Sequence, residues 1–134
     1  YSNNYLYNVL KGAINKKEIN HDRDGQEIRE YIHAFDAATL SVDIIESDNY
    51  KLEYFILTGI ERMKRIDLFT MISEIMNGDV KINLQEAVDD HHYKITPYSF
   101  HPSIAKKLVP NPYIDMGQGI LDCIREIHGQ SEND

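Results

Sequence analysis

The sequence predicts an α/β fold in which a small mixed sheet is packed by four or five helices. Several segments place apolar residues three and four positions apart, as amphipathic helices do, whereas the unbroken apolar run from Tyr54 to Thr58 is typical of a strand. From Asp24 to Ala38, a glycine turn, a short alternating strand and an acid-capped helix follow without a gap. The 134 residues suit one domain, which can bury roughly two thirds of its unfolded surface.

The first quarter of the chain is expected to form a helix and two strands. The segment from Asn4 to Ile14 is amphipathic, with Asn3 or Asn4 as its N-cap. A short strand is expected from Lys17 to Asn20. A polar turn that contains Gly25 then leads into a strand from Ile28 to His33, whose alternation puts three side chains on one face: Arg29, Tyr31 and His33.

The next two elements are expected to be a helix and a buried strand. Asp36 is expected to cap a helix that runs to about Ile45. The apolar residues of that helix predict its buried side, which consists of Ala37, Ala38, Leu40, Val42, Ile44 and Ile45. The run from Tyr54 to Thr58, closed by Gly59, suits a strand that is buried on both faces.

The second half of the chain alternates in the same way. The expected elements are a helix from Ile66 to Met76 that stops at Asn77-Gly78, strands from Val80 to Leu84 and from Tyr93 to Tyr98, a helix from Pro102 to Leu108, and a helix capped by Asp115 that ends near His128. Residues 1–129 are therefore expected to form one lobe, and residues 130–134 a disordered tail.

The composition of the chain excludes some classes of function. A formal net charge of −8 argues against a broad nucleic-acid surface, because such binding needs many Lys and Arg contacts to phosphate. Cys123 is the only cysteine, and its apolar neighbours favour a buried, inert thiol. No apolar run approaches the roughly 20 residues that cross a bilayer, and no leader is recognised, so a cytoplasmic protein is expected. The start at Tyr1 suggests a piece of a longer protein.

Arg29 is the first candidate for binding an anion. Its guanidinium offers a rigid fork of donors that suits a diphosphate, and a strand that follows a glycine turn can aim it inward. The alternative is a solvent-facing arginine paired with Glu27 or Tyr31.

No metal site and no basic binding patch are expected. His33 and Asp36 are explained as a strand end and a helix cap. The adjacent His91 and His92 point apart on a strand, and no zinc-type spacing accompanies the histidines. Solvated helix faces explain the two basic pairs, Lys64-Arg65 and Lys106-Lys107.

The stretch from Asp24 to Ala38 resembles the substrate-side strand of the extended short-chain dehydrogenases/reductases, the NAD-dependent sugar-nucleotide epimerases and dehydratases. In that family a glycine turn leads into a strand whose arginine reaches the nucleotide diphosphate, and a His-x-x-Asp then opens a helix. Thr58-Gly59 followed by Asp67-Leu68 is similar to another motif of the family's C-terminal, substrate-binding part. Arg23 departs from the pattern, because it replaces the first glycine of the turn.

The resemblance implies roles for four residues. Asn4 would contact the nucleotide and Arg29 the diphosphate. His92 or Lys94 would reach the same phosphates from the other side. The parent enzyme would use NAD(P), act on a nucleotide sugar and form a homodimer.

Two features of the complete enzymes are not expected in this chain. The sequence shows no glycine-rich strand-turn-helix to hold a dinucleotide, and the family's acid-base Tyr-x-x-x-Lys pair is expected to be absent. The chain alone is therefore expected to bind no cofactor, to hold no catalytic residue and to be inactive without a Rossmann domain. The alternative hypothesis is a non-enzymatic α/β interaction module whose acidic surface meets a basic protein partner.

Overall fold

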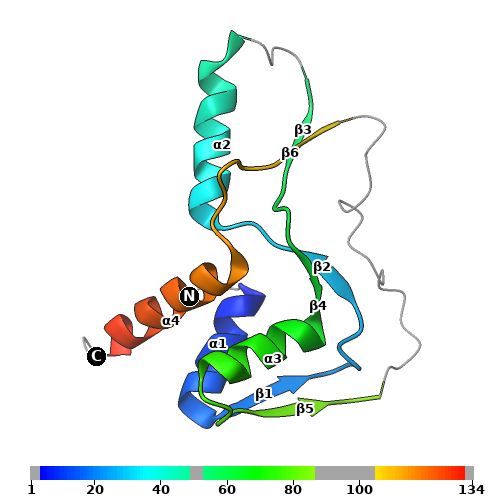
Figure 1. The fold of residues 1–134 in the computed structure, drawn as a ribbon, viewed down its shortest axis with the longest axis vertical. Helices are drawn as coiled ribbons and strands as arrows, with labels where there is room; N and C mark the ends of the chain where they lie inside the picture. Colours follow the sequence, from blue (N-terminus) through cyan, green and yellow to red (C-terminus); the bar gives the residue numbers. More distant parts are fainter. Residues whose placement is uncertain (1–3, 49–52, 87–104, 132–134) are drawn as a thin grey trace.

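The computed structural model describes residues 4–48, 53–86 and 105–131, and it confirms a mixed α/β fold (Figure 1). The described helices are α1 (Tyr5–Lys16), α2 (Ala34–Glu46), α3 (Arg65–Ile75) and α4 (Met116–Ser131). The described strands are β1 (Glu18–His21), β2 (Ile28–Glu30), β3 (Phe55–Leu57), β4 (Arg62–Lys64), β5 (Lys81–Leu84) and β6 (Lys106–Leu108). None of these helices combines the length and the hydropathy that a bilayer crossing requires.

The described strands form three separate pairs instead of one continuous sheet. β1 lies parallel to β5, β2 antiparallel to β4, and β3 parallel to β6. Figure 1 shows α1, α3 and α4 gathered near β1 and β5, whereas α2 lies near β3 and β6 at the other end. The β2–β4 pair lies between these two groups. We term this middle region, where β2 and β4 meet the starts of α1 and α3, the junction.

The main core is formed by α1, α3, α4 and β1, as the periodicity of these segments predicts. The fully buried side chains that meet there include Leu10, Ile19, Leu68, Phe69, Ile72 and Ile120. Burying each such side chain contributes about 1.5 to 3 kcal/mol relative to leaving it exposed. This end of the molecule therefore has a continuous apolar interior.

The helix ends of the core follow local chemistry, as expected. The Asn4 side chain accepts a hydrogen bond from the Leu6 amide at 2.9 Å, which confirms the N-cap of α1. Asp115 accepts from the Gln118 amide at 2.9 Å at the start of α4. α3 stops where Asn77 and Gly78 adopt positive φ angles of 60° and 77°.

The start of α2 differs from the prediction. His33 is the N-cap, because its Nδ1 accepts from the Phe35 amide at 3.2 Å, so the strand ends earlier, at Glu30. Asp36 lies inside the first turn, where its buried carboxylate accepts from the Ile114 amide at 2.8 Å. The carboxylate is thus used to hold a distant segment, and the imidazole replaces it as the cap.

The expected buried side of α2 is wrong in part. Ala38 is exposed, Val42 is 51% exposed and Ile45 is 82% exposed. Asp36 is the only buried residue of this helix. The strand expected to be buried on both faces, β3, is only half-buried, because its one partner in the described part of the chain is β6.

Residues 106–108 form β6, and the helix expected there is wrong for these residues. The Lys106 amide donates to the Tyr54 carbonyl at 2.9 Å, and the Thr58 amide donates to the Leu108 carbonyl at 3.1 Å. Lys107 is not solvated as expected, because its ammonium pairs with Glu30, whose side chain is 3% exposed. The strand expected from Tyr93 to Tyr98 and the helix start at Pro102 lie outside the described residues.

α4 extends into the segment expected to be a disordered tail. Gln130 and Ser131 are helical, and the Tyr7 hydroxyl donates to Gln130 Oε1 at 2.8 Å. Residues 132–134 lie outside the described residues.

Gly59 is required by close packing against β2. A Cβ atom built there would lie 1.4 Å from the Tyr31 carbonyl oxygen, so the two segments must separate in a Gly59→Ala variant. We expect the free energy of unfolding in urea to fall by about 1 to 3 kcal/mol, the usual cost of overpacking.

Gly129→Ala is the matched control, because a Cβ at this helical position meets no atom within 4 Å. It should leave stability unchanged or raise it slightly. Equal stability of the two variants would show that Gly59 is not constrained by Tyr31.

Candidate functional site

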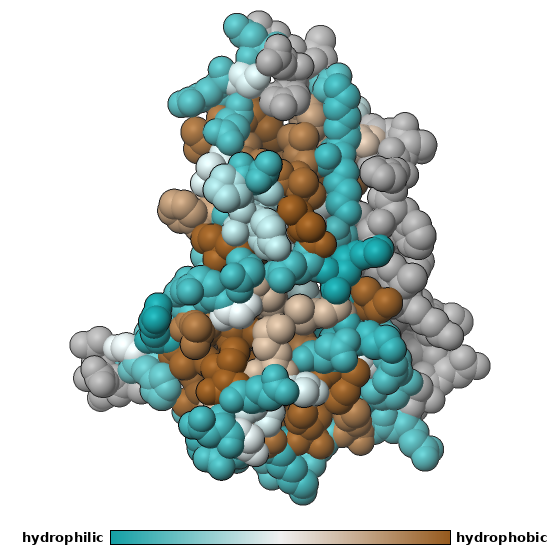
Figure 2. All heavy atoms as spheres, in the orientation of Figure 1, coloured by the Kyte–Doolittle hydropathy of each residue, from teal (hydrophilic) through white to brown (hydrophobic). Residues whose placement is uncertain are grey.

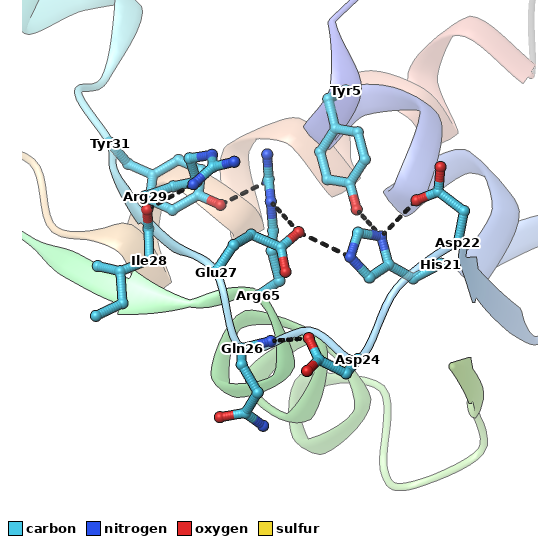
Figure 3. Close-up of polar contacts among 10 residues, drawn as sticks. All are labelled: Tyr5, His21, Asp22, Asp24, Gln26, Glu27, Ile28, Arg29, Tyr31 and Arg65. Atoms are coloured by element: carbon cyan, nitrogen blue, oxygen red, sulfur yellow. Dashed lines mark hydrogen bonds and ion pairs between the residues drawn. The ribbon is translucent and has the colours of Figure 1, made fainter. Parts of the chain in front are cut away.

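Arg29 lies in the middle of β2, opposite Met63 of β4, and Tyr31 follows two residues later, just beyond the end of the strand. It is half-buried, and its Nη1 donates to the Ile28 carbonyl at 2.8 Å. Tyr31 lies close enough for the positive charge of Arg29 to lower its pKa. Glu27 accepts a hydrogen bond from His21 and lies near Arg65 (Figure 3).

The glycine turn before β2 is anchored on the first turn of α3. Gly25 has a φ of 72°, which favours glycine, and its carbonyl accepts from the Ile66 amide at 3.0 Å. The Glu27 carbonyl accepts from the Arg65 amide at 3.1 Å. These bonds satisfy two amides that a helix N-terminus leaves without an intrahelical partner, and they fix where β2 begins.

Arg65 occupies the centre of the junction, although its sequence context suggested a solvated helix face. Its side chain is only 14% exposed. The guanidinium carbon lies 3.9 Å from the centroid of the Tyr5 ring, and Nη1 donates to the Tyr31 hydroxyl at 2.7 Å (Figure 3). Arg65 therefore joins the first residue of α1 to the end of β2, a role that no local pattern indicates.

A partly buried chain of polar groups continues from Arg65 through Glu27 and His21 to Tyr5, whose side chain is at the edge of the cluster. Glu27 lies 3.9 Å from Arg65 Nε and accepts a hydrogen bond from His21 Nε2 at 2.8 Å. Because a carboxylate only accepts, Nε2 carries the proton in this bond, and Nδ1 forms a hydrogen bond with the Tyr5 hydroxyl at 3.0 Å. The second oxygen of Glu27 is buried without a hydrogen-bond partner.

Burial raises the pKa of both tyrosines in this cluster. The pKa of Tyr5 rises from 10.0 to about 12 because its phenol is removed from water, although the Arg65 guanidinium lowers it. Burial also raises the pKa of Tyr31, against the lowering effects of Arg65 and Arg29. The effect of Arg29 on Tyr31 shows that the two side chains are electrostatically coupled.

A cavity of about 330 Å³ opens beside this cluster, and Asn4, Tyr31 and His33 are among its lining residues. Its other polar lining residues are acidic: Glu61, Asp115, Asp122 and Glu126. Carboxylates repel phosphate, so a neutral, hydroxyl-bearing group suits this cavity better than an anion, and Arg29 is not among its lining residues. The sequence analysis missed these acids, because nothing in their spacing marks them as neighbours.

The structure brings two of the four predicted site residues to one junction. Asn4 caps α1 directly before Tyr5, Arg29 lies on β2 two residues before Tyr31, and Arg65 bridges the two tyrosines. His92 and Lys94 lie outside the described residues. In the described ranges, no group of three His, Cys, Asp or Glu side chains is arranged to hold a metal ion.

The expectation that the chain has no Tyr-x-x-x-Lys spacing is wrong, because this spacing occurs at Tyr7 and Lys11 of α1. The Tyr7 hydroxyl donates to Gln130 of α4, and Lys11 is exposed. Tyr7 therefore joins α1 to α4, and it takes no part in the contacts around Arg65.

Comparison with solved structures gives the fold. Neither a family model nor a curated protein matches the chain. A UDP-glucuronic acid 4-epimerase from Bacillus cereus, solved with UDP-glucuronic acid and NAD, superposes with a TM-score of 0.70 at 16% identity, over 93% of this chain and 40% of that chain. The NAD-dependent NDP-hexosamine 5,6-dehydratase TunA, of tunicamycin biosynthesis, gives a TM-score of 0.67 at 10% identity, over 91% and 38%.

These similarities confirm the expected fold, and the chain spans about 40% of the length of the structures that it matches. The epimerase solved with NAD alone gives the same result, with a TM-score of 0.63 at 15% identity.

The burial of Tyr5 predicts a loss of stability at high pH. Its folded-state pKa of about 12 exceeds the ordinary 10.0, so the contribution of Tyr5 to stability is complete below pH 10 and is lost as pH rises towards 12. Urea unfolding followed between about pH 9 and pH 11 should show this decline.

Tyr5→Phe is the control, because it keeps the ring over Arg65 and removes the ionising group. The variant should lose part of the decline, whereas an unchanged pH dependence would mean that Tyr5 titrates alike in the folded and unfolded chain.

Proposed function

We propose that this chain is the substrate-binding part of an NAD-dependent sugar-nucleotide epimerase or dehydratase, and that it grips the nucleotide diphosphate through Arg29. The observation that carries the proposal is the position of Arg29, which the glycine turn and Arg65 hold at the same junction as the N-terminus of α1. The similarity in fold to two enzymes of this kind supports it.

The chemistry divides between the residues of this junction and another part of the protein. Arg29 would bind the diphosphate, Asn4 the nucleotide, and His92 or Lys94 the phosphates from the opposite side. In the parent enzyme, bound NAD would supply the redox chemistry, which is the removal of a hydride from a hydroxyl-bearing carbon of the sugar and its later return, while a base outside this chain would take the hydroxyl proton.

The turn at Gly25 differs from a dinucleotide-binding turn. The carbonyls of Gly25 and Glu27 already accept from the first amides of α3, so these amides are not available to bind a pyrophosphate. The described residues therefore fit the substrate side.

The exposed side of α2 supports the presence of a second lobe. Phe35, Ala38, Val42 and Ile45 follow at spacings of three and four and form what we term the α2 stripe. Phe35 and Ile45 are 69% and 82% exposed. Figure 2 shows apolar side chains (brown) at the surface of the upper part of the molecule, where α2 lies in Figure 1. A cavity of about 350 Å³ beside the stripe is lined by Phe35, Leu40 and Tyr113. Such a surface is typical of an interface.

The occupant that we propose for the α2 stripe is the dinucleotide-binding lobe of the same polypeptide. The matched epimerase chain is longer, and its greater part has no counterpart here. A second copy of this surface fits poorly, because α2 carries Asp43 and Glu46 and no Lys or Arg, so paired copies would oppose like charges. A cytoplasmic enzyme that pairs as a homodimer would therefore use another surface for pairing.

The role of Arg29 is tested by titrating the labelled chain with UDP-, GDP- and dTDP-sugars in an NMR experiment. One of them should shift resonances of Arg29 and Tyr31, whereas NAD should not. Arg29→Ala should weaken this binding by about 1.5 to 3 kcal/mol, the contribution of a hydrogen bond to a charged group.

Arg62→Ala is the matched control, because this exposed arginine lies on the paired strand opposite Glu30, on the other face from Arg29. If the wild-type chain binds none of the sugar nucleotides, the interaction module becomes the better hypothesis. If Arg29→Ala binds as well as Arg62→Ala, Arg29 has no role in the grip.

The second lobe is tested by hydrogen exchange. In the longer polypeptide that carries this chain, amides of α2 should exchange at least about tenfold more slowly than in the chain alone, because the stripe is covered. α1 is the internal control, since its Leu10 and Ala13 are already buried. Equal exchange of α2 in both proteins would remove the stripe as the interface.

A further inference from the structure

Arg65 contacts both elements that carry the proposed nucleotide contacts. On one side its guanidinium stacks 3.9 Å from the Tyr5 ring centroid, and Tyr5 directly follows Asn4. On the other side Nη1 donates to the Tyr31 hydroxyl at 2.7 Å, and Tyr31 follows Arg29 by two residues and lies near enough for the Arg29 charge to lower its pKa. The Arg65 guanidinium thus contacts a neighbour of each of the two residues, Asn4 and Arg29, that are proposed to bind the ligand.

The geometry of Arg65 suits a group that positions others and does not touch the ligand itself. Its side chain is 14% exposed, its Nε lies 3.9 Å from Glu27, and one of its faces is covered by Tyr5. A guanidinium can stack and donate at once, because its donors lie in the plane of the stacked group. A lysine ammonium in the same place offers no such plane.

We propose that Arg65 is a positioning residue of the nucleotide-sugar site, which sets the separation of Asn4 and Arg29 through Tyr5 and Tyr31. This inference rests on the proposed function. The close contact between Gly59 and the Tyr31 carbonyl supports this inference, because Gly59 packs so closely against the Tyr31 backbone that no Cβ atom would fit between them. Tyr31 is therefore fixed by its backbone and by its hydroxyl, and Arg29 lies two residues before it.

The experiment compares four variants of the full chain by the affinity for the sugar nucleotide that the wild type binds. Arg65→Met removes both contacts and should weaken binding roughly tenfold, since displacing binding groups by a fraction of an ångström has effects of this size. Tyr31→Phe removes only the hydroxyl acceptor and should give part of that loss. Arg65→Lys keeps the charge and should not restore full affinity.

Lys64→Met is the matched control. It removes a positive charge one residue earlier, where the exposed ammonium donates to Gln26 Oε1 at 2.9 Å, and it leaves both tyrosine contacts intact. Its affinity should stay within about twofold of the wild type. This comparison separates the positioning effect from the simple loss of a positive charge.

A spectroscopic measurement keeps the test independent of stability. In Tyr31→Phe, which changes neither charge nor ring packing, the Arg29 Nε resonance of the ligand-free protein should move, and its response to the sugar nucleotide should shrink. If the wild type binds and Arg65→Met and Tyr31→Phe bind equally well, the inference is wrong and the proposed function stands. If the wild type does not bind, both are wrong.

Discussion

The arrangement of the candidate site depends on one contact, the Arg65 guanidinium between Tyr5 and Tyr31. Arg65 begins α3, Tyr5 begins α1 and Tyr31 follows β2, so three elements that are distant in sequence meet at one planar group. Burying this charge costs solvation free energy, which stacking, a hydrogen bond and nearby Glu27 offset. The clearest consequence of the cluster is therefore geometric, because it holds the starts of α1 and α3 and the segment after β2 together.

The backbone supports the same geometry. The carbonyls of Gly25 and Glu27 accept from the first amides of α3, and the Glu27 side chain lies under the turn, bonded to His21. A Cβ at Gly25 would lie 3.2 Å from Ile66, so both the positive φ and the close approach favour glycine. Backbone hydrogen bonds therefore join the turn and the start of α3, and they fix the position of β2 although this strand has only three residues.

The two ends of the molecule are held by different forces. α1, α3 and α4 share an apolar core in which Leu10, Phe69 and Ile120 are fully buried. α2 buries only Asp36, whose carboxylate holds the Ile114 amide. Apolar burial is the main source of cooperative stability, so α2 gains most from a partner that covers its stripe. The second lobe that we propose would be such a partner.

The sequence by itself determined the elements whose signals are local. Apolar spacing identified α1, α3 and α4, and Asn4, Asp115 and Gly78 marked their ends, because capping and helical periodicity act within a few residues. The strand that carries Arg29 was also predicted, although it ends at Glu30 and not at His33.

Only the tertiary structure decided which charged side chains are buried and what they hold. Lys107 pairs with Glu30 across 77 positions, Arg65 reaches Tyr31 across 34, and Asp36 holds Ile114 across 78, which left capping to His33. Residues 106–108 likewise have a pattern that predicts a helix, and they form strand β6 because they pair with β3. A charged group is buried only where a partner from another segment compensates its lost hydration, and no spacing along the chain shows which distant segment will supply that partner.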